Sequence, residues 1–194
     1  MLHKGTRTLS TERLVLRPFV MEDAQAMFNN WASDPEVTRF LTWPTHASED
    51  ISRMIASEWV SNYDNPEFYQ WAIVPRADVF GDKPGAGEPI GSISAVEVNN
   101  DIGKLQIGYC ISRAWWNMGI TSDALGELIR FFFEEVEADR VEARHDTNNP
   151  NSGRVMAHCG MKYEGTLRRA DRNNQGVCDA AYYGILKEEY FAGK

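Results

Sequence analysis

One stretch of the chain, residues 107–125 (IGYCISRAWWNMGITSDAL), constrains the fold more than any other. It begins as a β-strand, passes through a loop that contains Gly119, and continues directly into an amphipathic helix. The N-terminus of a helix offers unpaired backbone N–H groups and the positive end of a dipole, so this order of elements can hold a phosphate group. A glycine between a strand and a helix can also serve turn geometry alone, and spacing leaves both interpretations open.

The length and composition favour one domain over residues 1–194, with its core at about residues 11–190. The chain has 194 residues, of which 43% are hydrophobic, and this is enough to bury one good core. No internal repeat or low-complexity segment divides it.

The charge of the chain restricts its partners. A net charge of −8 and a sequence pI near 5.0 disfavour nucleic acid and acidic membranes, which attract basic surfaces. An amine-bearing partner would be attracted by the negative electrostatic field of such a chain. The charged N-terminus is not followed by an apolar stretch, and no segment approaches the roughly 18 apolar residues of a membrane helix. We therefore expect a cytoplasmic protein.

The three cysteines, Cys110, Cys159 and Cys178, are widely spaced and form no Cys-x-x-Cys pair. This pattern supports neither a disulfide framework nor a zinc site, and no metal is expected. We interpret the three thiols as small buried side chains rather than nucleophiles.

Periodicity predicts seven strands and four helices. The strands are expected at residues 14–17, 69–74, 90–98, 104–111, 140–145, 161–167 and 180–186. The helices are expected at about residues 24–31, from Ser48 with a stripe of Ile51, Met54, Ile55 and Trp59, after Gly119, and from Pro150 with Asn149 as N-cap and Gly160 just beyond the end.

Several local features complete this outline. Residues 75–89 are rich in proline and glycine and read as a long exposed loop. The tryptophans Trp31, Trp43 and Trp59 are expected in the core or in a pocket wall. Strands 104–111 and 140–145 are joined through a helix and should be parallel neighbours in an otherwise mostly antiparallel sheet. The fold class is therefore α+β.

The chain resembles the Gcn5-related N-acetyltransferases (GNAT), and within them the branch that acetylates the N-terminal amine of ribosomal proteins. The resemblance covers nearly the whole chain, and the order and spacing of four short pieces carry it. These are residues 11–18 (TERLVLRP), 107–109 (IGY) with 116–121 (WNMGIT), 149–155 (NPNSGRV) and 160–167 (GMKYEGTL). The resemblance implies a sheet of six to seven strands flanked by about four helices, in which strand 104–111 splays from strand 140–145.

The resemblance also implies where acetyl-coenzyme A, the co-substrate, would bind. Backbone N–H groups of the loop would wrap its diphosphate, which makes Met118, Gly119, Ile120, Thr121 and Ser122 the candidate binding residues. The pantetheine arm would enter the splay, where the N–H of Ile111 is our candidate to polarise the thioester carbonyl. Asn149 would face the same arm, although capping of the helix explains this residue equally well.

The implied reaction is direct attack of a neutral amine on the thioester. Ser152 matches the serine that this branch is thought to use as proton donor to the departing thiolate, although it can also be read as a second polar residue at a helix start. Many relatives place a tyrosine seven residues after the asparagine, and this chain has Met156 there.

The general base is the clearest departure from the family. Gln106 stands where many relatives carry glutamate, and an amide takes no proton at neutral pH. Glu97 acting through water, another carboxylate, or an amine that arrives neutral are the alternatives. His145 is a weaker candidate because a surface or hydrogen-bonded histidine explains it as well.

The acceptor is expected to be a protein or peptide N-terminus, on the resemblance alone. A small amine, such as a polyamine, an amino acid or an aminoglycoside, is the second choice, and a non-catalytic coenzyme A-binding module is a third. The walls of the acceptor cleft should come from the Trp31–Trp43 region and the final hairpin. Both a monomer and a homodimer remain open.

Overall fold

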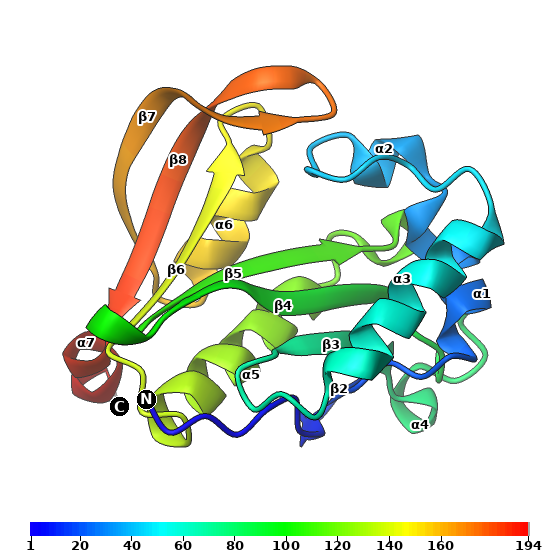
Figure 1. Cartoon of the computed structure of the whole chain (residues 1–194), viewed down its shortest axis with the longest axis horizontal. Helices are drawn as coiled ribbons and strands as arrows, with labels where there is room; N and C mark the ends of the chain where they lie inside the picture. The colour runs from blue at the N-terminus through cyan, green and yellow to red at the C-terminus, as the bar shows by residue number, and fades with distance from the viewer. Residues whose placement is uncertain (194) are drawn as a thin grey trace.

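The computed structural model describes residues 1–193 (Figure 1). Its strands are β1 (Leu9–Ser10), β2 (Leu14–Arg17), β3 (Gln70–Pro75), β4 (Gly91–Asn99), β5 (Lys104–Ile111), β6 (Arg140–Asp146), β7 (Lys162–Asn173) and β8 (Gly176–Leu186). Its α-helices are α1 (Asp23–Met27), α2 (Pro35–Thr38), α3 (Glu49–Asn62), α4 (Ala77–Phe80), α5 (Ile120–Glu134), α6 (Pro150–His158) and α7 (Lys187–Ala192). A π-helical turn, Phe28–Ala32, extends α1, and short 3-10 turns occupy Asn100–Ile102 and Arg113–Trp115.

The strands form one eight-stranded sheet in the order β1-β2-β3-β4-β5-β6-β8-β7. Each neighbouring pair is antiparallel except β5 and β6, which are parallel as predicted. The predicted α+β fold is therefore confirmed. The strand missing from the prediction is β1, whose two residues are too few to show a periodic pattern.

The sheet opens between β5 and β6. Their pairing runs only from Lys104 opposite Arg140 to Ile107 opposite Ala143. Beyond that point β5 continues along β4 as far as Ile111, whereas β6 follows β8 as far as Asp146. The two halves of the sheet diverge there, and this opening is the splay expected from the family resemblance.

Helices cover the two faces of the sheet differently. Helix α5 packs Leu125, Leu128 and Phe132 into the larger apolar cluster, against Leu105 and Ile107 of β5. Helices α1 and α3 lie on the opposite face, in front of the sheet in Figure 1. Strand β3 is buried along its whole length because it lies between these two layers.

Helix α3 begins after Ser48, as predicted, but its buried stripe differs from the prediction. Met54 is 62% exposed, whereas the small residues Ser52 and Ala56 are fully buried. Short side chains at the contact let α3 lie close to α1, and His46 Nδ1 lies 2.7 Å from Ser52 Oγ to satisfy the buried hydroxyl.

Residues 75–89 form a largely exposed loop, as predicted, but the loop has local structure. They contain helix α4, and the ring of Phe80 packs edge-on against Trp115 with 5.0 Å between the ring centroids. Gly85 adopts φ +87° beside the same tryptophan, a conformation that favours glycine. The segment therefore supports the turn that follows β5.

Within residues 1–193, no helix has the length and apolar character needed to span a bilayer. Cytoplasmic localisation stays a prediction from the sequence.

Candidate active site

Gly119 is the N-cap of helix α5 and adopts φ +72°, a left-handed conformation that other residues adopt at a cost. Arg13, which lies between β1 and β2, contacts the carbonyl side of this loop. Its Nη1 donates to the carbonyl of Met118 at 3.0 Å and its Nη2 to the carbonyl of Gly119 at 3.3 Å. Its Nε donates to Asp123 Oδ2 at 3.1 Å. One guanidinium therefore fixes both peptide groups of the turn and the first turn of the helix.

This contact determines where the N–H groups of the loop point. In a trans peptide the C=O and the N–H point in opposite directions. Because Arg13 holds the carbonyls of Met118 and Gly119, the N–H groups of Gly119 and Ile120 point away from Arg13. On that side lies a cavity of about 650 Å³, which we call the cofactor cavity. Gly119, Ile120, Thr121 and Ser122 line it; Met118 does not, and its carbonyl belongs to the Arg13 side.

The end of strand β5 presents backbone groups to the same cavity. The N–H of Ser112 donates to the carbonyl of Ile90 at 2.7 Å, so that residue faces β4. Since alternate residues of a strand direct their backbone groups to opposite neighbours, the N–H and C=O of Ile111 face the side from which β6 has diverged. Trp116 Nε1 donates to this carbonyl at 3.0 Å, and the position of the Ile111 N–H suits a hydrogen bond to a thioester oxygen.

The start of helix α6 supplies polar side chains to the opening. Asn149 occupies the N-cap position and Pro150 the first helical position, as predicted, but the Asn149 side chain makes no capping hydrogen bond. Its Nδ2 instead donates to Ser152 Oγ at 3.3 Å. A hydroxyl that accepts one hydrogen bond still has its own proton to give, so the proton of Ser152 is available to another group.

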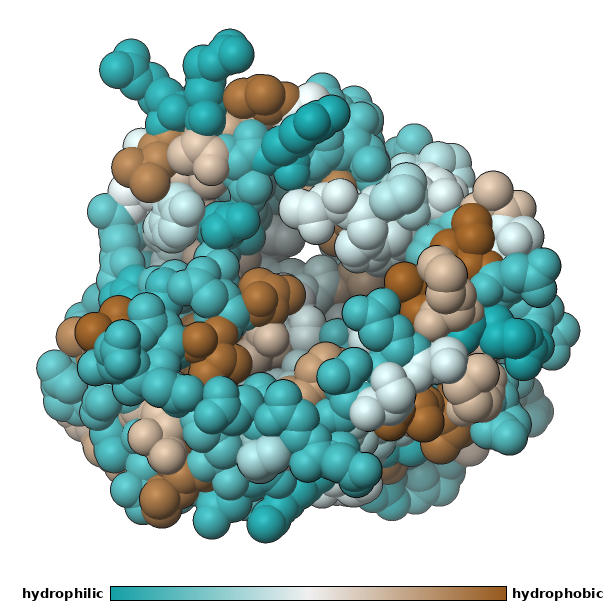
Figure 2. Space-filling model, in the orientation of Figure 1, coloured by the Kyte–Doolittle hydropathy of each residue, from teal (hydrophilic) through white to brown (hydrophobic). Residues whose placement is uncertain are grey.

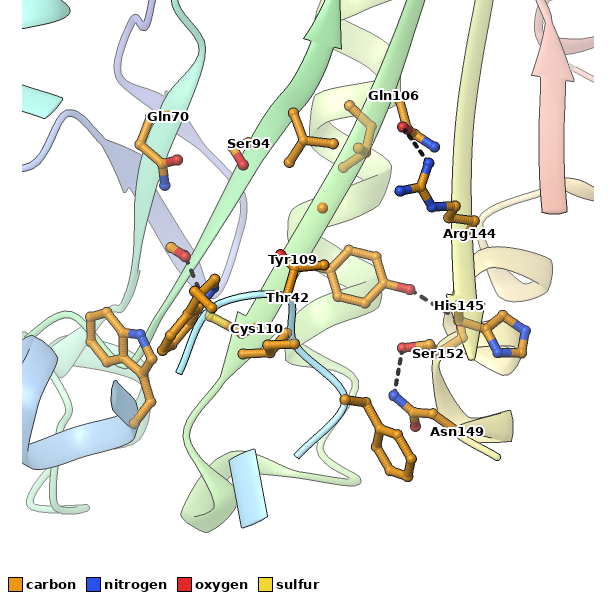
Figure 3. A pocket seen from close by; sticks show the side chains of 18 of the residues that line it. Thr42, Gln70, Ser94, Gln106, Tyr109, Cys110, Arg144, His145, Asn149 and Ser152 are labelled. Atoms are coloured by element: carbon orange, nitrogen blue, oxygen red, sulfur yellow. Dashed lines mark hydrogen bonds between the residues drawn. The ribbon is translucent and has the colours of Figure 1, made fainter. Parts of the chain in front are cut away.

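Tyr109 crosses the splay from β5 to α6. Its hydroxyl donates to the backbone carbonyl of Ser152 at 3.0 Å, and Figure 3 shows the phenol pointing across the opening. Burial raises the pKa of Tyr109 well above its ordinary value of 10.0, and the phenol therefore stays protonated. The sequence pattern did not indicate a role for Tyr109, although this residue ends the IGY piece that carries the family resemblance.

A second cavity of about 670 Å³, the acceptor cavity, lies between the sheet and helices α1 and α3. Trp31, Trp43 and Trp59 line it, which confirms that these tryptophans form a pocket wall. The two cavities meet in the splay. The residues common to both linings are Phe40, Leu41, Tyr109, Cys110, Asn149 and Ser152.

A strap of hydrogen bonds joins the final hairpin to the segment with Leu41 and Trp43, which lines the acceptor cavity. The Nδ2 of Asn174 donates to the carbonyls of Thr38 and Trp43, both at 2.8 Å. The N–H of Asn174 donates to the carbonyl of Leu41 at 3.1 Å. Figure 1 shows the hairpin tip reaching toward the α2 segment, and in Figure 2 the surface is hollowed between them.

A β-bulge places Glu97 on the face that lines the acceptor cavity. Ser92 and Ser94 of β4 lie opposite Cys110 and Gly108 on this face, and strict alternation would turn the next odd-numbered residues away. The pairing shifts between Ala95 and Glu97, so Glu97 lies directly opposite Gln106. Glu97 is therefore the neighbour, on strand β4, of Gln106 on β5, the position where many relatives carry glutamate.

The Glu97 side chain is 48% exposed and forms an ion pair with Lys104, with Oε1 3.1 Å from Nζ. Lys104 also pairs with Glu142 at 2.9 Å. The carboxylate therefore has an ordered cationic partner while its outer side remains open to water.

His145 lies on the other side of β6, toward helix α6. Its Nδ1 is 2.7 Å from the carbonyl of Asp146, so this nitrogen carries the proton and donates it. Its Nε2 is buried without a partner in the part of the chain that the structure describes, next to Gly153. Figure 3 shows the ring turned away from Tyr109, a placement that does not favour His145 as the base.

Arg144 and His145 both line the acceptor cavity, and Arg144 is held there by two partners. Its Nε donates to Asp171 Oδ2 at 2.6 Å, and its Nη1 donates to Gln106 Oε1 at 3.3 Å. This ion pair ties β6 to the hairpin strand β7. The sequence did not predict this ion pair. Arg144 and Asp171 are 27 residues apart, and local periodicity does not show which distant residues meet.

The cysteines are free thiols, and burial raises the pKa of each, to about 12 for Cys159 and about 11 for Cys178. Cys110 is buried and its Sγ lies 3.4 Å from Ser92 Oγ. Raised pKa values keep these sulfurs protonated at neutral pH, and a protonated thiol is a poor nucleophile. Among residues 1–193, no three His, Cys, Asp or Glu side chains are grouped so that they could hold a metal ion.

Comparison with known proteins places this geometry in a family. Residues 13–162 match the acetyltransferase (GNAT) domain. A Bacillus licheniformis protein named as the uncharacterized N-acetyltransferase p20 is 29% identical over 94% of this chain and 98% of its own length. Bacillus subtilis YdaF, named as a candidate ribosomal N-acetyltransferase, is 31% identical over 69% of this chain and 79% of its own length.

Solved structures agree on the fold. The coenzyme A complex of RimL, a ribosomal alpha-N-protein acetyltransferase, superposes with a TM-score of 0.79 at 17% identity, covering 93% of this chain and 98% of that one. With a family match over more than half of its residues, the chain belongs to the GNAT acetyltransferases and is an N-acetyltransferase.

Proposed function

We propose that this N-acetyltransferase moves the acetyl group of acetyl-coenzyme A directly to a primary amine, and that the amine is the N-terminus of a protein or peptide. The observation that carries the proposal is the meeting of two cavities at Tyr109, Asn149 and Ser152. One cavity presents backbone N–H groups and the other presents side chains. Two substrates that enter from the two sides would meet at the hydroxyl of Ser152.

The residues of the cofactor cavity fit acetyl-coenzyme A. The N–H groups of Gly119 and Ile120, together with the first turn of α5 at Thr121 and Ser122, suit a diphosphate. Met118 contributes through its carbonyl, which keeps the turn in place. Acetyl-coenzyme A supplies the activated acetyl group, and the N–H of Ile111 would stabilise negative charge on its carbonyl oxygen.

The chain then has to move two protons. As the new C–N bond forms and the C–S bond breaks, the amine loses a proton and the sulfur gains one. Ser152 would donate to the sulfur, with Asn149 holding its oxygen. Glu97 would accept the amine proton through water, because the bulge brings its carboxylate to the acceptor side.

The ribosomal N-acetyltransferases among the similar proteins support an N-terminal amine as the acceptor.

The test is calorimetric titration of acetyl-coenzyme A into the protein, followed by thiol release with a panel of peptides and small amines. Micromolar binding with amine-dependent release is expected, with peptides as the best acceptors. Binding without release by any amine would contradict the transfer proposal, and faster release with polyamines than with peptides would contradict the acceptor.

Ser152→Ala tests the proton donor. We expect kcat to fall by about 100-fold, the lower range for general acid catalysis, with an unchanged Kd for acetyl-coenzyme A. An unchanged kcat would remove Ser152 from the mechanism.

A further inference from the structure

Gln70 is a polar side chain in the acceptor cavity whose amide nitrogen has no hydrogen-bond partner among residues 1–193. It lies on β3 and is 7% exposed, and its Nε2 is buried. Figure 3 shows the amide directed toward the space lined by the labelled residues. An unpaired buried amide destabilises a protein, so its retention calls for an explanation.

The backbone groups of Gln70 are paired without its side chain. Its N–H donates to Thr6 Oγ1 at 3.0 Å, and its carbonyl accepts from the Tyr63 hydroxyl at 2.9 Å. Directly across the sheet lies Ser94, whose hydroxyl also lines the cavity. The pair Gln70 and Ser94 therefore forms a polar notch with donors for an oxygen atom that the protein itself does not supply.

The charges around the notch indicate that this oxygen is uncharged. Arg144 is the one Lys or Arg side chain lining the cavity within the described residues, and Asp171 and Gln106 already engage it. Burial lowers the pKa of His46 and keeps its ring neutral. A carboxylate placed at Gln70 would be buried without a counter-ion, which is strongly unfavourable. A neutral carbonyl oxygen carries no such penalty.

Apolar side chains also line this cavity, among them Trp43, Ile55 and Trp59. Tyr109 and Ser152 line it at the splay. A ligand with its oxygen at Gln70 would share the cavity with these apolar side chains and would direct its amine toward the splay.

We infer that the Gln70–Ser94 notch is an acceptor subsite that selects amines carrying an uncharged carbonyl group, as an amino-acid amide or the first residue of a peptide does, over free amino acids and simple amines. The inference rests on the proposed acetyl transfer and adds the feature by which the acceptor is chosen.

Three probes with the same side chain isolate the carbonyl: leucinamide, leucine and 3-methylbutylamine. Thiol release is measured for each with wild-type protein and with Gln70→Leu, at equal concentrations of neutral amine. Wild type should favour leucinamide in kcat/KM over both other probes. Gln70→Leu should reduce kcat/KM for leucinamide by about tenfold, the effect of one hydrogen bond, and change 3-methylbutylamine by less than about twofold.

A matched stability measurement separates selection from a structural role. Because leucine replaces an unpaired buried amide with an apolar group of similar size, Gln70→Leu should keep or raise the Tm of the free protein. A lower Tm with equal losses for all probes would show a structural role and overturn the inference, as would an equal preference of both proteins for leucinamide. Ser94→Ala leaves the β3 side chains intact. It should also lower kcat/KM selectively for leucinamide, by less than Gln70→Leu does.

The outcomes also separate this inference from the proposed function. Thiol release with leucine or 3-methylbutylamine equal to that with leucinamide would overturn the subsite and leave acetyl transfer intact. Bound acetyl-coenzyme A with no release from any of the three probes or from peptides would overturn the transfer itself.

Discussion

The two cavities that meet in the splay are built in different ways. The cofactor cavity presents backbone groups from consecutive residues, chiefly the turn at Gly119 and the end of β5. The acceptor cavity presents side chains from distant segments, and the hydrogen bonds of the strap join Asn174 to residues 131 and 136 positions earlier. Backbone geometry tolerates sequence change, whereas side chains define the shape and polarity of a site. If the proposed roles hold, the cofactor half depends on backbone geometry, and the acceptor half depends on the side chains that this chain carries.

Among the changes that distinguish the two cavities, Arg13→Ala should have the largest effect, and it should affect cofactor binding alone. The change removes the three hydrogen bonds that fix the Met118 and Gly119 carbonyls and Asp123. We expect the Kd for acetyl-coenzyme A to rise about thirtyfold, or ~2 kcal/mol, after allowing for the partial exposure of the arginine. Calorimetric titration measures this.

Arg53→Ala is the control variant. It also removes an arginine, in this case from an exposed ion pair with Glu49 on α3, and it should leave the Kd for acetyl-coenzyme A unchanged. An equal Kd for Arg13→Ala and wild type would show that the loop holds its shape without the guanidinium, and the contrast between the two halves would lose its main support.

Asn174→Ala should affect the acceptor half instead. Two side-chain hydrogen bonds of the strap are lost, while the backbone bond to Leu41 remains. The KM for the acceptor should rise about tenfold, with the Kd for acetyl-coenzyme A unchanged. Steady-state kinetics with a saturating cofactor decide this. A parallel rise in the cofactor Kd would mean that the two halves are mechanically coupled.

Tyr109→Phe tests the boundary between the cofactor cavity and the acceptor cavity, because Tyr109 lines both. Losing the hydrogen bond to the Ser152 carbonyl should lower the free energy of unfolding by about 1 kcal/mol and shift α6 slightly relative to β5. We expect kcat to fall about threefold with little change in either binding constant. Denaturant unfolding and kinetics of the same preparation report both effects. A far larger loss of kcat would assign the phenol itself to proton transfer.

The smallest effect is a pH dependence confined to the acceptor half. Burial lowers the pKa of His46 from its ordinary value of 6.5, so the unfolded chain takes up this proton at a higher pH than the folded protein does. The contribution to stability is therefore present above about pH 6.5 and declines as the pH falls through that value and below. We measure the free energy of unfolding of wild type and of His46→Gln between pH 7 and pH 5. It should fall less steeply with falling pH in the variant than in wild type. Identical slopes would contradict it.

The sequence predicted the features that depend on local pattern. Alternation along β5 places Leu105 and Ile107 in the core and Gln106 in the cavity, and the strand, glycine and helix order predicts the turn at Gly119. The features that it did not reveal depend on tertiary contact.

Met54 of α3 is one example, because its exposure depends on how closely α3 approaches α1 rather than on the period of the helix. The bulge between Ala95 and Glu97 is another, since nothing in the residue pattern shows where one extra residue enters a strand. Arg13 stood inside the TERLVLRP piece that carries the resemblance, but its role depends on residues more than 100 positions away. Its partner could not be deduced from the strand pattern.

That separation has a consequence for how the protein is made. Arg13 is synthesised early, and the carbonyl of Met118 that it holds follows 105 residues later. The N-terminal strands therefore carry a guanidinium with no final partner through much of translation, and the turn at Gly119 can be shaped only when the two ends of this long loop close. A nascent chain that stops short of α5 should lack the diphosphate turn altogether. Affinity for coenzyme A on partially synthesised chains would thus mark the moment at which the central sheet has assembled.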